Sequence, residues 1–356
     1  MEEKLRNLVS TKIKMLSDLK KSLGVEKSVF VLGNTRVKDD KMFYWTPIRR
    51  SKKFVSIGIV IFSEDEARIV LKEIDGCVDY IFVDCEKKSK NSNAFGLFNL
   101  ERLSYEVISK SILKFYKGND LTTDALDKTI LSILKNSSKL VGGCNILVVG
   151  MGNLGFKITL KLVERGANVY VLNRNIEKAI KLIDTINLIK PPETLASAKF
   201  VNNKNNFEID YIFDIIVLTH LDTIPENDHI YLSTNNKCVF IDVGKGCLTK
   251  HQINQLVKKG NICLRLDIGD SLLEYIFTEI IFDGTKTNLI PTQKILENRR
   301  IISTGLIGDK EDIVVDDAEN PSFFYGICDG SGGFKEYLSE DDRKFINTII
   351  FPKVNE

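Results

Sequence analysis

The sequence lacks the features that mark several special classes of protein. None of its apolar runs approaches the ~18 residues that a membrane-spanning helix needs. The N-terminus, Met1-Glu2-Glu3-Lys4, opens a charged amphipathic stretch and has no signal-peptide pattern. The formal net charge is only +2 and the basic residues are spread out, so no nucleic-acid-binding face is expected. These absences predict a cytoplasmic protein that binds neither nucleic acid nor a membrane.

Cysteine and histidine are arranged in ways that argue against disulfides and metal ions. The seven cysteines are odd in number, include no Cys-x-x-Cys pair and lie mostly in or beside apolar runs. They indicate reduced core thiols. The three histidines are scattered along the chain, so we expect no His-based zinc site and no bound metal.

A strand–turn–helix–strand unit lies between Asn145 and Arg174. Residues 146–149 form an unbroken apolar run rich in β-branched side chains, which is typical of a parallel strand buried on both faces. The turn that follows, residues 150–155, reads Gly-Met-Gly-Asn-Leu-Gly. An amphipathic stretch and a second apolar run, 169–172, complete the unit, so the glycines stand in the context that a dinucleotide site requires.

Each glycine of this turn has a mechanical role in such a site. Gly150 permits the tight turn, Gly152 lets the backbone approach a pyrophosphate, and Gly155 lets the helix pack closely on the strand. The first N–H groups of that helix, around Asn153 and Leu154, carry a partial positive charge that favours phosphate. The alternative is a glycine turn in an α/β domain without a ligand.

The end of the second strand distinguishes NADP from NAD. An NAD site places Asp or Glu there to accept a hydrogen bond from the ribose 2′-hydroxyl. This chain has Asn173 and Arg174 instead, and its next acidic residue is Glu177. Arg174 can pair with a 2′-phosphate, and Lys178 can add positive charge. NADP is therefore favoured over NAD; the alternative is that Arg174 is a solvated arginine at a strand end.

Hydrophobic periodicity predicts alternating strands and helices through most of the chain. The strands are expected at 28–32, 55–62, 78–83, 146–149, 169–172, 214–219, 239–242 and 262–266. The helices are expected at 5–23, 64–74 (after a Ser63 cap), 100–115, 123–134, 154–163, 176–186, 250–259 and 271–281. Short strand-like runs separated by Gly and Asp follow residue 285. Such alternation indicates parallel, doubly wound sheets.

These elements predict an α/β protein in four parts. We expect an N-terminal helix (1–27), an α/β substrate domain (28–135), a Rossmann domain with a doubly wound parallel sheet (136–284) and a small β-rich C-terminal extension (285–356). The N-terminal helix is amphipathic, so it packs on the body or on a second subunit. A homodimer is therefore one arrangement that the sequence leaves open.

Four short segments resemble the shikimate/quinate dehydrogenase family within residues 28–283. They are Val-Leu-Gly-Asn (31–34), Asp-Cys-Glu-Lys (84–87), Thr-Thr-Asp-Ala (122–125) and Asn-Arg (173–174). The family has Gly-Asn, its catalytic lysine, its catalytic aspartate and its NADP-reading Asn-Arg at these places. The resemblance implies a dehydrogenase that transfers a hydride between NADP and a carbonyl or alcohol carbon, with Lys87 and Asp124 as catalytic residues.

That chemistry needs a proton donor beside the substrate oxygen, and an ammonium next to a carboxylate meets the need. Lys87 would give the proton, and Asp124 would orient it and share a hydrogen bond with the substrate. The alternatives are that Lys87 is solvated in a lysine-rich turn and that Asp124 only complements a helix dipole. Asp120 is the nearest competitor for the acidic role.

The chain departs from the family where the substrate would be recognised. The family's two carboxylate-binding serines fall on Asp39 and Lys41, and its Asn-Val-Thr-x-Pro stretch is reduced to the lysine. We therefore expect a distant, extended member whose small polar substrate is a different one. The basic run Arg49–Lys53 would suit an anionic substrate group, although a solvated loop is the simpler reading.

Several further residues are candidates for the site. Thr219 follows a strand of the Rossmann block and would lie near the nicotinamide ribose, with His220 beside it. Gly269 precedes a late helix and is a candidate for backbone contact with the nicotinamide. Cys85 would carry a thioester if the enzyme were a different kind of reductase. A glycine-rich turn at 330–333 is either a phosphate loop or an exposed turn.

Overall fold

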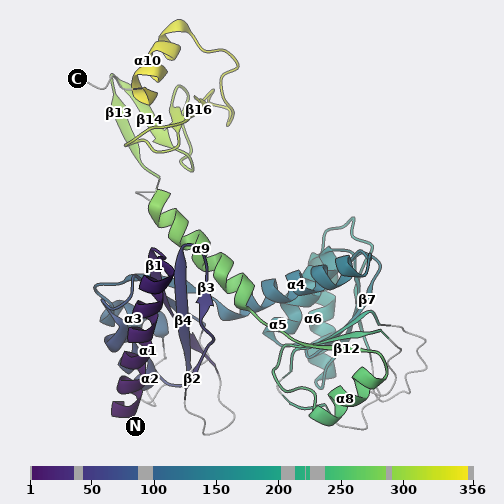
Figure 1. Cartoon of the computed structure of the whole chain (residues 1–356). Helices are drawn as coiled ribbons and strands as arrows, with labels where there is room; N and C mark the ends of the chain where they lie inside the picture. The colour runs from purple at the N-terminus through teal and green to yellow at the C-terminus, as the bar shows by residue number, and fades with distance from the viewer. Residues whose placement is uncertain are drawn as a thin grey trace. The chain divides into compact units, whose positions relative to one another are not determined.

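The computed structural model describes residues 2–35, 43–86, 99–201, 213–220, 222–224, 237–285 and 291–351 (Figure 1). The chain divides into two units, Met1–Thr278 and Glu279–Glu356. No helix of the described ranges is long and apolar enough to cross a membrane.

The first half of the first unit is built on a sheet with a parallel centre. Its strands are β1 (Lys27–Asn34), β4 (Phe54–Ile61), β5 (Tyr80–Asp84) and β6 (Ile112–Tyr116), in the order β4-β1-β5-β6. Two short strands, β2 (Tyr44–Trp45) and β3 (Arg49–Arg50), pair antiparallel with β4. Helices α1 (Glu2–Leu23), α2 (Glu64–Ile74) and α3 (Leu100–Val107) contribute apolar side chains to the core of this sheet.

The start of α2 follows the expected cap. The Ser63 side chain accepts a hydrogen bond from the Glu66 N–H, and the Glu66 carboxylate accepts one from the Ser63 N–H. This reciprocal pair satisfies two donors that the first helical turn leaves open. A capping box of this kind can be recognised in the sequence, because its two residues are three positions apart.

The expected helix over 100–115 is wrong in its second half. Helix α3 ends at Val107, and strand β6 begins at Ile112. The Asp75 carboxylate, from the end of α2, accepts hydrogen bonds of 3.0 Å from the N–H groups of Ser109, Lys110 and Ser111. This distant carboxylate stabilises a turn where the periodicity continued a helix, and it directs the chain into the sheet.

The second half of the first unit is a parallel sheet in the order β12-β11-β10-β7-β8-β9. Its strands are β7 (Asn145–Val149), β8 (Asn168–Leu172), β9 (Ala198–Phe200), β10 (Ile215–Leu218), β11 (Val239–Asp242) and β12 (Ile262–Arg265). Its helices are α4 (Gly118–Asn136), α5 (Asn153–Glu164), α6 (Ile176–Ile189) and α8 (Lys250–Lys258). Helix α9 (Gly269–Thr285) follows β12, contacts the first sheet through Tyr275 and runs past the unit boundary. This is the strand order of a Rossmann domain, so the expected doubly wound fold is confirmed.

Strand β7 explains why its sequence is apolar without alternation. Ile146 and Val148 belong to the core on one face of the sheet, whereas Leu147 and Val149 belong to the core on the other. The strand order reverses beside β7, because β8 lies on one side of it and β10 on the other. Ligands of such sheets bind in the crevice at the carboxyl ends of the strands around this point.

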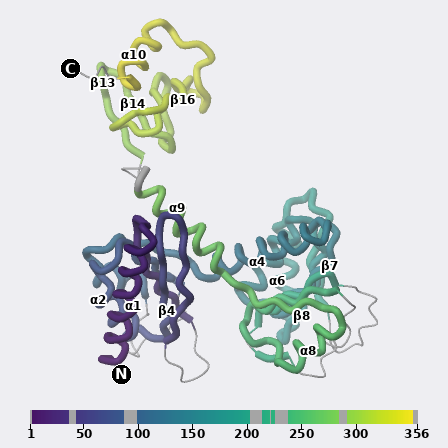
Figure 2. The backbone as a smooth tube through the Cα atoms, in the orientation of Figure 1, coloured from purple at the N-terminus to yellow at the C-terminus, as the bar shows by residue number. Residues whose placement is uncertain are grey.

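The second unit confirms the expected β-rich extension. Its sheet runs β13 (Gln293–Leu296), β14 (Arg299–Ser303), β15 (Ile313–Val315) and β16 (Phe324–Ile327). Helix α10 (Glu340–Ile350), which the sequence analysis did not anticipate, lies beside this sheet (Figure 2). Its apolar side chains share one buried core with those of the sheet. In the turn at 330–333, the Asp329 carboxylate accepts the N–H groups of Ser331 and Gly333. Two of the backbone donors that a phosphate would use are therefore engaged by a carboxylate of the same turn, which favours an ordinary turn.

Candidate dinucleotide-binding site

The glycine turn connects the end of β7 to the start of α5. Gly150 has a φ of +102°, in the left-handed region that glycine adopts without strain. A Cβ at this position would lie 2.8 Å from the Thr219 hydroxyl oxygen. The Gly150 N–H donates to the Leu172 carbonyl at 2.8 Å, which ties the turn to β8. Only glycine meets both the backbone and the packing requirement here.

The other two glycines differ in what surrounds them. A Cβ at Gly155 would lie 1.9 Å from the Gly150 carbonyl oxygen, so glycine is needed for α5 to approach the strand. A Cβ at Gly152 would meet no atom within 4 Å, although this residue is the N-cap of α5. Gly152 supplies no side-chain cap for the N–H groups of Asn153 and Leu154. Open space over uncapped helical N–H groups fits a pyrophosphate.

Asn173 and Thr219 both support this turn from neighbouring strands. The Asn173 amide oxygen accepts the Met151 N–H at 3.0 Å, and its amide nitrogen donates to the Asn175 carbonyl at 2.8 Å. The Thr219 hydroxyl donates to the Gly150 carbonyl at 2.8 Å. Both residues were expected to bind cofactor; the structure shows that their side chains hold the turn in shape.

Arg174 and Lys178 extend from the end of β8 and the first turn of α6. The Arg174 side chain is 88% exposed, and its guanidinium lies 3.1 Å from the Asp222 carboxylate. Lys178 is exposed, and its N–H is capped by the Asn175 side chain at 2.9 Å. An exposed ion pair contributes little stability, so exchanging Asp222 for a phosphate at Arg174 costs little.

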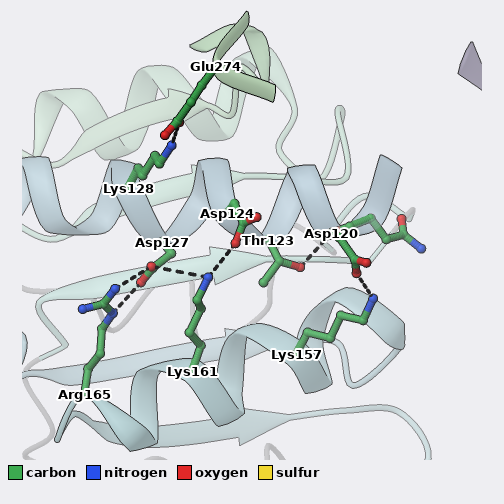
Figure 3. A network of polar contacts seen from close by, with 10 residues as sticks. Asp120, Thr123, Asp124, Asp127, Lys128, Lys157, Lys161, Arg165 and Glu274 are labelled. Carbon is green, nitrogen blue, oxygen red and sulfur yellow. Dashed lines mark hydrogen bonds and ion pairs between the residues drawn. The ribbon is translucent and has the colours of Figure 1, made fainter. Parts of the chain in front are cut away.

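Asp124, the expected catalytic carboxylate, lies in an ion-pair ladder between α4 and α5 (Figure 3). Its carboxylate accepts a hydrogen bond from the Lys161 ammonium at 2.6 Å. The ladder contains three acidic residues of α4 that face two lysines of α5 and Arg165, the C-cap of α5. The pairs are Asp120 with Lys157, Asp124 with Lys161, and Asp127 with Arg165.

The members of this ladder are not equivalent. Asp127 is 6% exposed and receives two hydrogen bonds of 2.8 Å from Arg165, whereas Asp124 is about half exposed. The sequence analysis missed the ladder because its partners lie 37 to 38 residues apart. The signal it contained was the four-residue spacing of the basic residues along α5. Lys87, the expected partner of Asp124 in catalysis, lies outside the described residues.

A buried polar cluster lies at the carboxyl ends of β1, β5 and β6. The Asn34 amide donates to the Asp84 carbonyl at 2.9 Å, and the Asp84 carboxylate accepts the Gly118 N–H at 3.1 Å. Burial, and then the nearby Asp84 charge, raise the pKa of the Tyr116 phenol well above its usual value. Sequence reasoning did not single out Tyr116, because the strand that carries it was taken for a helix.

The Cys85 thiol is not set up as a nucleophile. It donates to the Tyr116 carbonyl at 3.2 Å. Desolvation raises its pKa, and the charge of Asp84 raises it further. A nucleophilic cysteine needs the opposite shift, toward the thiolate. His220 is also unusual, since its buried Nδ1 has no hydrogen-bond partner in the described part of the chain.

Gly269 lies at the start of α9, where its N–H donates to the Asp267 carboxylate at 2.8 Å. A Cβ on Gly269 would lie 3.0 Å from the Arg49 Nε, so the absence of a side chain lets Arg49 approach this helix. Gly269 was expected to contact the nicotinamide through its backbone. The structure shows that its N–H is bound by Asp267, and its expected contact stays a prediction.

The strand order and the glycine turn together define a Rossmann domain. Residues 132–206 match the model of the shikimate/quinate 5-dehydrogenase family. This match confirms the resemblance over the glycine turn and the Asn-Arg pair. No curated protein sequence matches the chain.

Solved structures similar to this chain include three enzymes. Dipicolinate synthase A chain from Bacillus subtilis has 13% identity, a TM-score of 0.36, and coverage of 73% of this chain and 97% of that one. L-Tryptophan dehydrogenase from Nostoc punctiforme has 13% identity, a TM-score of 0.42, and coverage of 75% and 85%. A shikimate dehydrogenase in complex with NADP+ has 14% identity, a TM-score of 0.39, and coverage of 73% and 91%.

Proposed function

We propose that this chain is an NADP-dependent oxidoreductase. It transfers a hydride between the nicotinamide and a ketone or secondary alcohol of a small, anionic metabolite. The observation that carries the proposal is the open glycine turn at Gly152 followed by an exposed Arg174 where an NAD site would have an acid. The family match over residues 132–206 supports the same class of enzyme.

Cofactor preference is tested by titrating the protein with NADPH and NADH while following nicotinamide fluorescence. The matched pair of variants is Arg174→Ala and Arg102→Ala, since both side chains are exposed and each forms an ion pair. We expect NADPH to bind at least tenfold more tightly than NADH, and Arg174→Ala alone to remove the difference. If Arg174→Ala still prefers NADPH over NADH as strongly as the wild type, another residue distinguishes the two cofactors. If the wild type binds neither cofactor, the proposal is refuted.

The catalytic pair proposed for this reaction is Lys87 and Asp124. Lys87 would hand its proton to the substrate oxygen, and Asp124 would orient that ammonium. Because Asp124 is engaged with Lys161 at 2.6 Å, its role is tested against its neighbour in the ladder. If Asp124 is catalytic, Asp124→Asn lowers kcat at unchanged stability, whereas Asp127→Asn lowers stability at unchanged kcat. A wild-type kcat in Asp124→Asn would show that Asp124 is not catalytic and serves only in the ion pair with Lys161.

Three other functions are compatible with a Rossmann domain of this kind, and experiments can separate them. A thioester-forming reductase would depend on Cys85, and its raised pKa and its hydrogen bond to the Tyr116 carbonyl argue against it. Cys85→Ser would abolish a thioester reaction and spare ketone reduction. An amino-acid or imine dehydrogenase would share the cofactor site and be separated by a substrate screen. A non-catalytic NADP-binding module would bind cofactor with Lys87 and Asp124 both replaced and turn over no substrate.

A further inference from the structure

Three basic residues lie near the start of α9, where one of them, Arg49, contacts the exposed carboxylate of Asp267 and a second, Lys245, interacts electrostatically with Arg49, Arg265 and Asp267. Arg49 comes from β3, Lys245 from the loop after β11, and Arg265 from the end of β12. The carboxylate is Asp267, which accepts the Gly269 N–H and lies 3.5 Å from Arg49. The group therefore carries more positive than negative charge.

Arg49 is the most deeply placed of the three cations and is poorly paired. Its side chain is only 14% exposed. Among the described residues its guanidinium has two hydrogen bonds, both 3.5 Å long, to the Asp267 carboxylate and the Pro47 carbonyl. A guanidinium offers five N–H donors, and burying them without close acceptors is costly. The N–H donors of Arg49 could therefore form shorter hydrogen bonds to an added acceptor.

Lys245 occupies an unusual backbone position. Its φ is +63°, a strained value for a residue with a side chain, and its N–H is held by the Asp242 carboxylate at 2.8 Å. Its ammonium has no hydrogen bond or ion pair in the part of the chain that the structure describes. Desolvation lowers the pKa of Lys245, and Arg265 and Arg49 lower it further against the opposing charge of Asp267. An added anion would stabilise the protonated lysine.

Among the described residues, the Asp242 carboxylate forms no ion pair with Arg49, Lys245 or Arg265, because its oxygens face the backbone of the neighbouring loop. It accepts the N–H groups of Lys245, Gly246 and Cys247 and so holds the loop after β11. The loop and Arg265 lie at the carboxyl ends of parallel strands, the same edge of the sheet as the glycine turn after β7. An anion bound there would share an edge of the sheet with the cofactor proposed above.

We propose that Arg49, Lys245 and Arg265 form a binding site for a carboxylate or phosphate group of the substrate, and that Asp267 is the internal counter-ion displaced by it. This inference rests on the proposed function, to which it adds the residues that bind the anionic group of the substrate and the chemistry of that group. Arg49 supplies a forked pair of donors, and Lys245 supplies a point charge. The Asp267 side chain is largely exposed, so it can turn into solvent when the ligand enters.

The test measures binding of inorganic phosphate and, separately, malonate to the full chain by calorimetry. Lys245→Gln and Arg49→Gln should each raise the dissociation constant of the anion at least tenfold. Asp267→Asn should tighten it several-fold, because asparagine keeps an acceptor for the Gly269 N–H while removing the competing charge. Lys53→Gln is the matched control: it lies in the same basic run but pairs with Glu26 at 2.7 Å, so binding should stay within twofold.

Arg174→Ala separates this site from the cofactor site. Phosphate or malonate binding that survives Arg174→Ala and is lost in Lys245→Gln supports the proposal, and the anion that binds identifies the group on the substrate. Equal affinity in the wild type and Lys245→Gln would overturn it, as would loss of binding in Arg174→Ala alone or no binding of either probe. Lys245 is exposed, so this variant should fold even if Arg49→Gln does not. Failure of the wild type to bind NADPH would overturn the proposed function and leave these results standing.

Discussion

Replacing Gly152 by alanine should separate cofactor binding from folding. A Cβ at Gly152 would meet no atom within 4 Å, and its φ of −89° suits any residue. The new methyl group would occupy the space through which a pyrophosphate approaches the first N–H groups of α5. We therefore expect a protein that folds normally and binds NADPH weakly.

The magnitudes follow from two small folding effects and one larger binding effect. A glycine-to-alanine change at an unstrained position stabilises a protein by about 0.4–1 kcal/mol through the unfolded chain. Alanine is a worse N-cap than glycine by a similar amount, so the unfolding free energy should change by less than about 0.5 kcal/mol. Losing one hydrogen bond to a charged group costs about 1.5–3 kcal/mol, which weakens binding about 10- to 150-fold.

Two measurements and two matched variants check this reasoning. The NADPH dissociation constant comes from nicotinamide fluorescence, and the unfolding free energy comes from urea titration followed by circular dichroism. Gly142→Ala is the control, since its Cβ would make an ordinary contact of 3.7 Å with the Arg165 carbonyl. It should leave the NADPH dissociation constant unchanged and raise the unfolding free energy by at most about 1 kcal/mol. Gly155→Ala should lose stability, because its Cβ would overlap the Gly150 carbonyl. Wild-type affinity in Gly152→Ala would show that no pyrophosphate lies over this turn.

Two further predictions concern stability. Asp127→Asn should cost about 1.5–3 kcal/mol of unfolding free energy, because asparagine is uncharged and keeps only one of the two buried oxygens that accept from Arg165. Asp124→Asn should cost less than about 1 kcal/mol, because its ion pair is half exposed; equal costs in urea titrations would contradict this ranking. Burial lowers the pKa of His220, so the unfolded chain takes up a proton first and stability should fall as the pH drops from 7 to 5. His220→Gln should flatten that pH profile and His251→Gln, on the exposed face of α8, should not; a profile unchanged in His220→Gln would exclude this histidine as the cause.

The cofactor half of the candidate site was predictable because its signals are local. The turn at 150–155 is flanked within a few residues by the strand and the helix that give it meaning. The Ser63–Glu66 cap is likewise complete within four residues. The location of Asn173 and Arg174 directly after β8 was also predictable, because the apolar run before them indicates where the strand ends. The structure adds that Asn173 supports the turn through its contact with Met151.

The catalytic half was less predictable, because its contacts join distant parts of the chain. Asp124 was singled out from its own short segment, whereas its partner Lys161 lies 37 residues away on another helix. The Asp75 carboxylate changes the expected helix after Val107 into a turn and strand β6 by binding three N–H groups more than 30 residues away. Periodicity within one segment contains no information about such partners.

By itself, the sequence determined the Rossmann fold, the glycine turn and the basic residue at the end of β8, since each depends on backbone conformation and burial over short stretches. Only the tertiary structure decided which charges meet. It paired the acidic residues of α4 with the basic residues of α5, and it brought Arg49 to Asp267 across 218 residues of chain. The physical reason is that Coulomb interactions and hydrogen bonds depend on distance in space, and folding sets that distance.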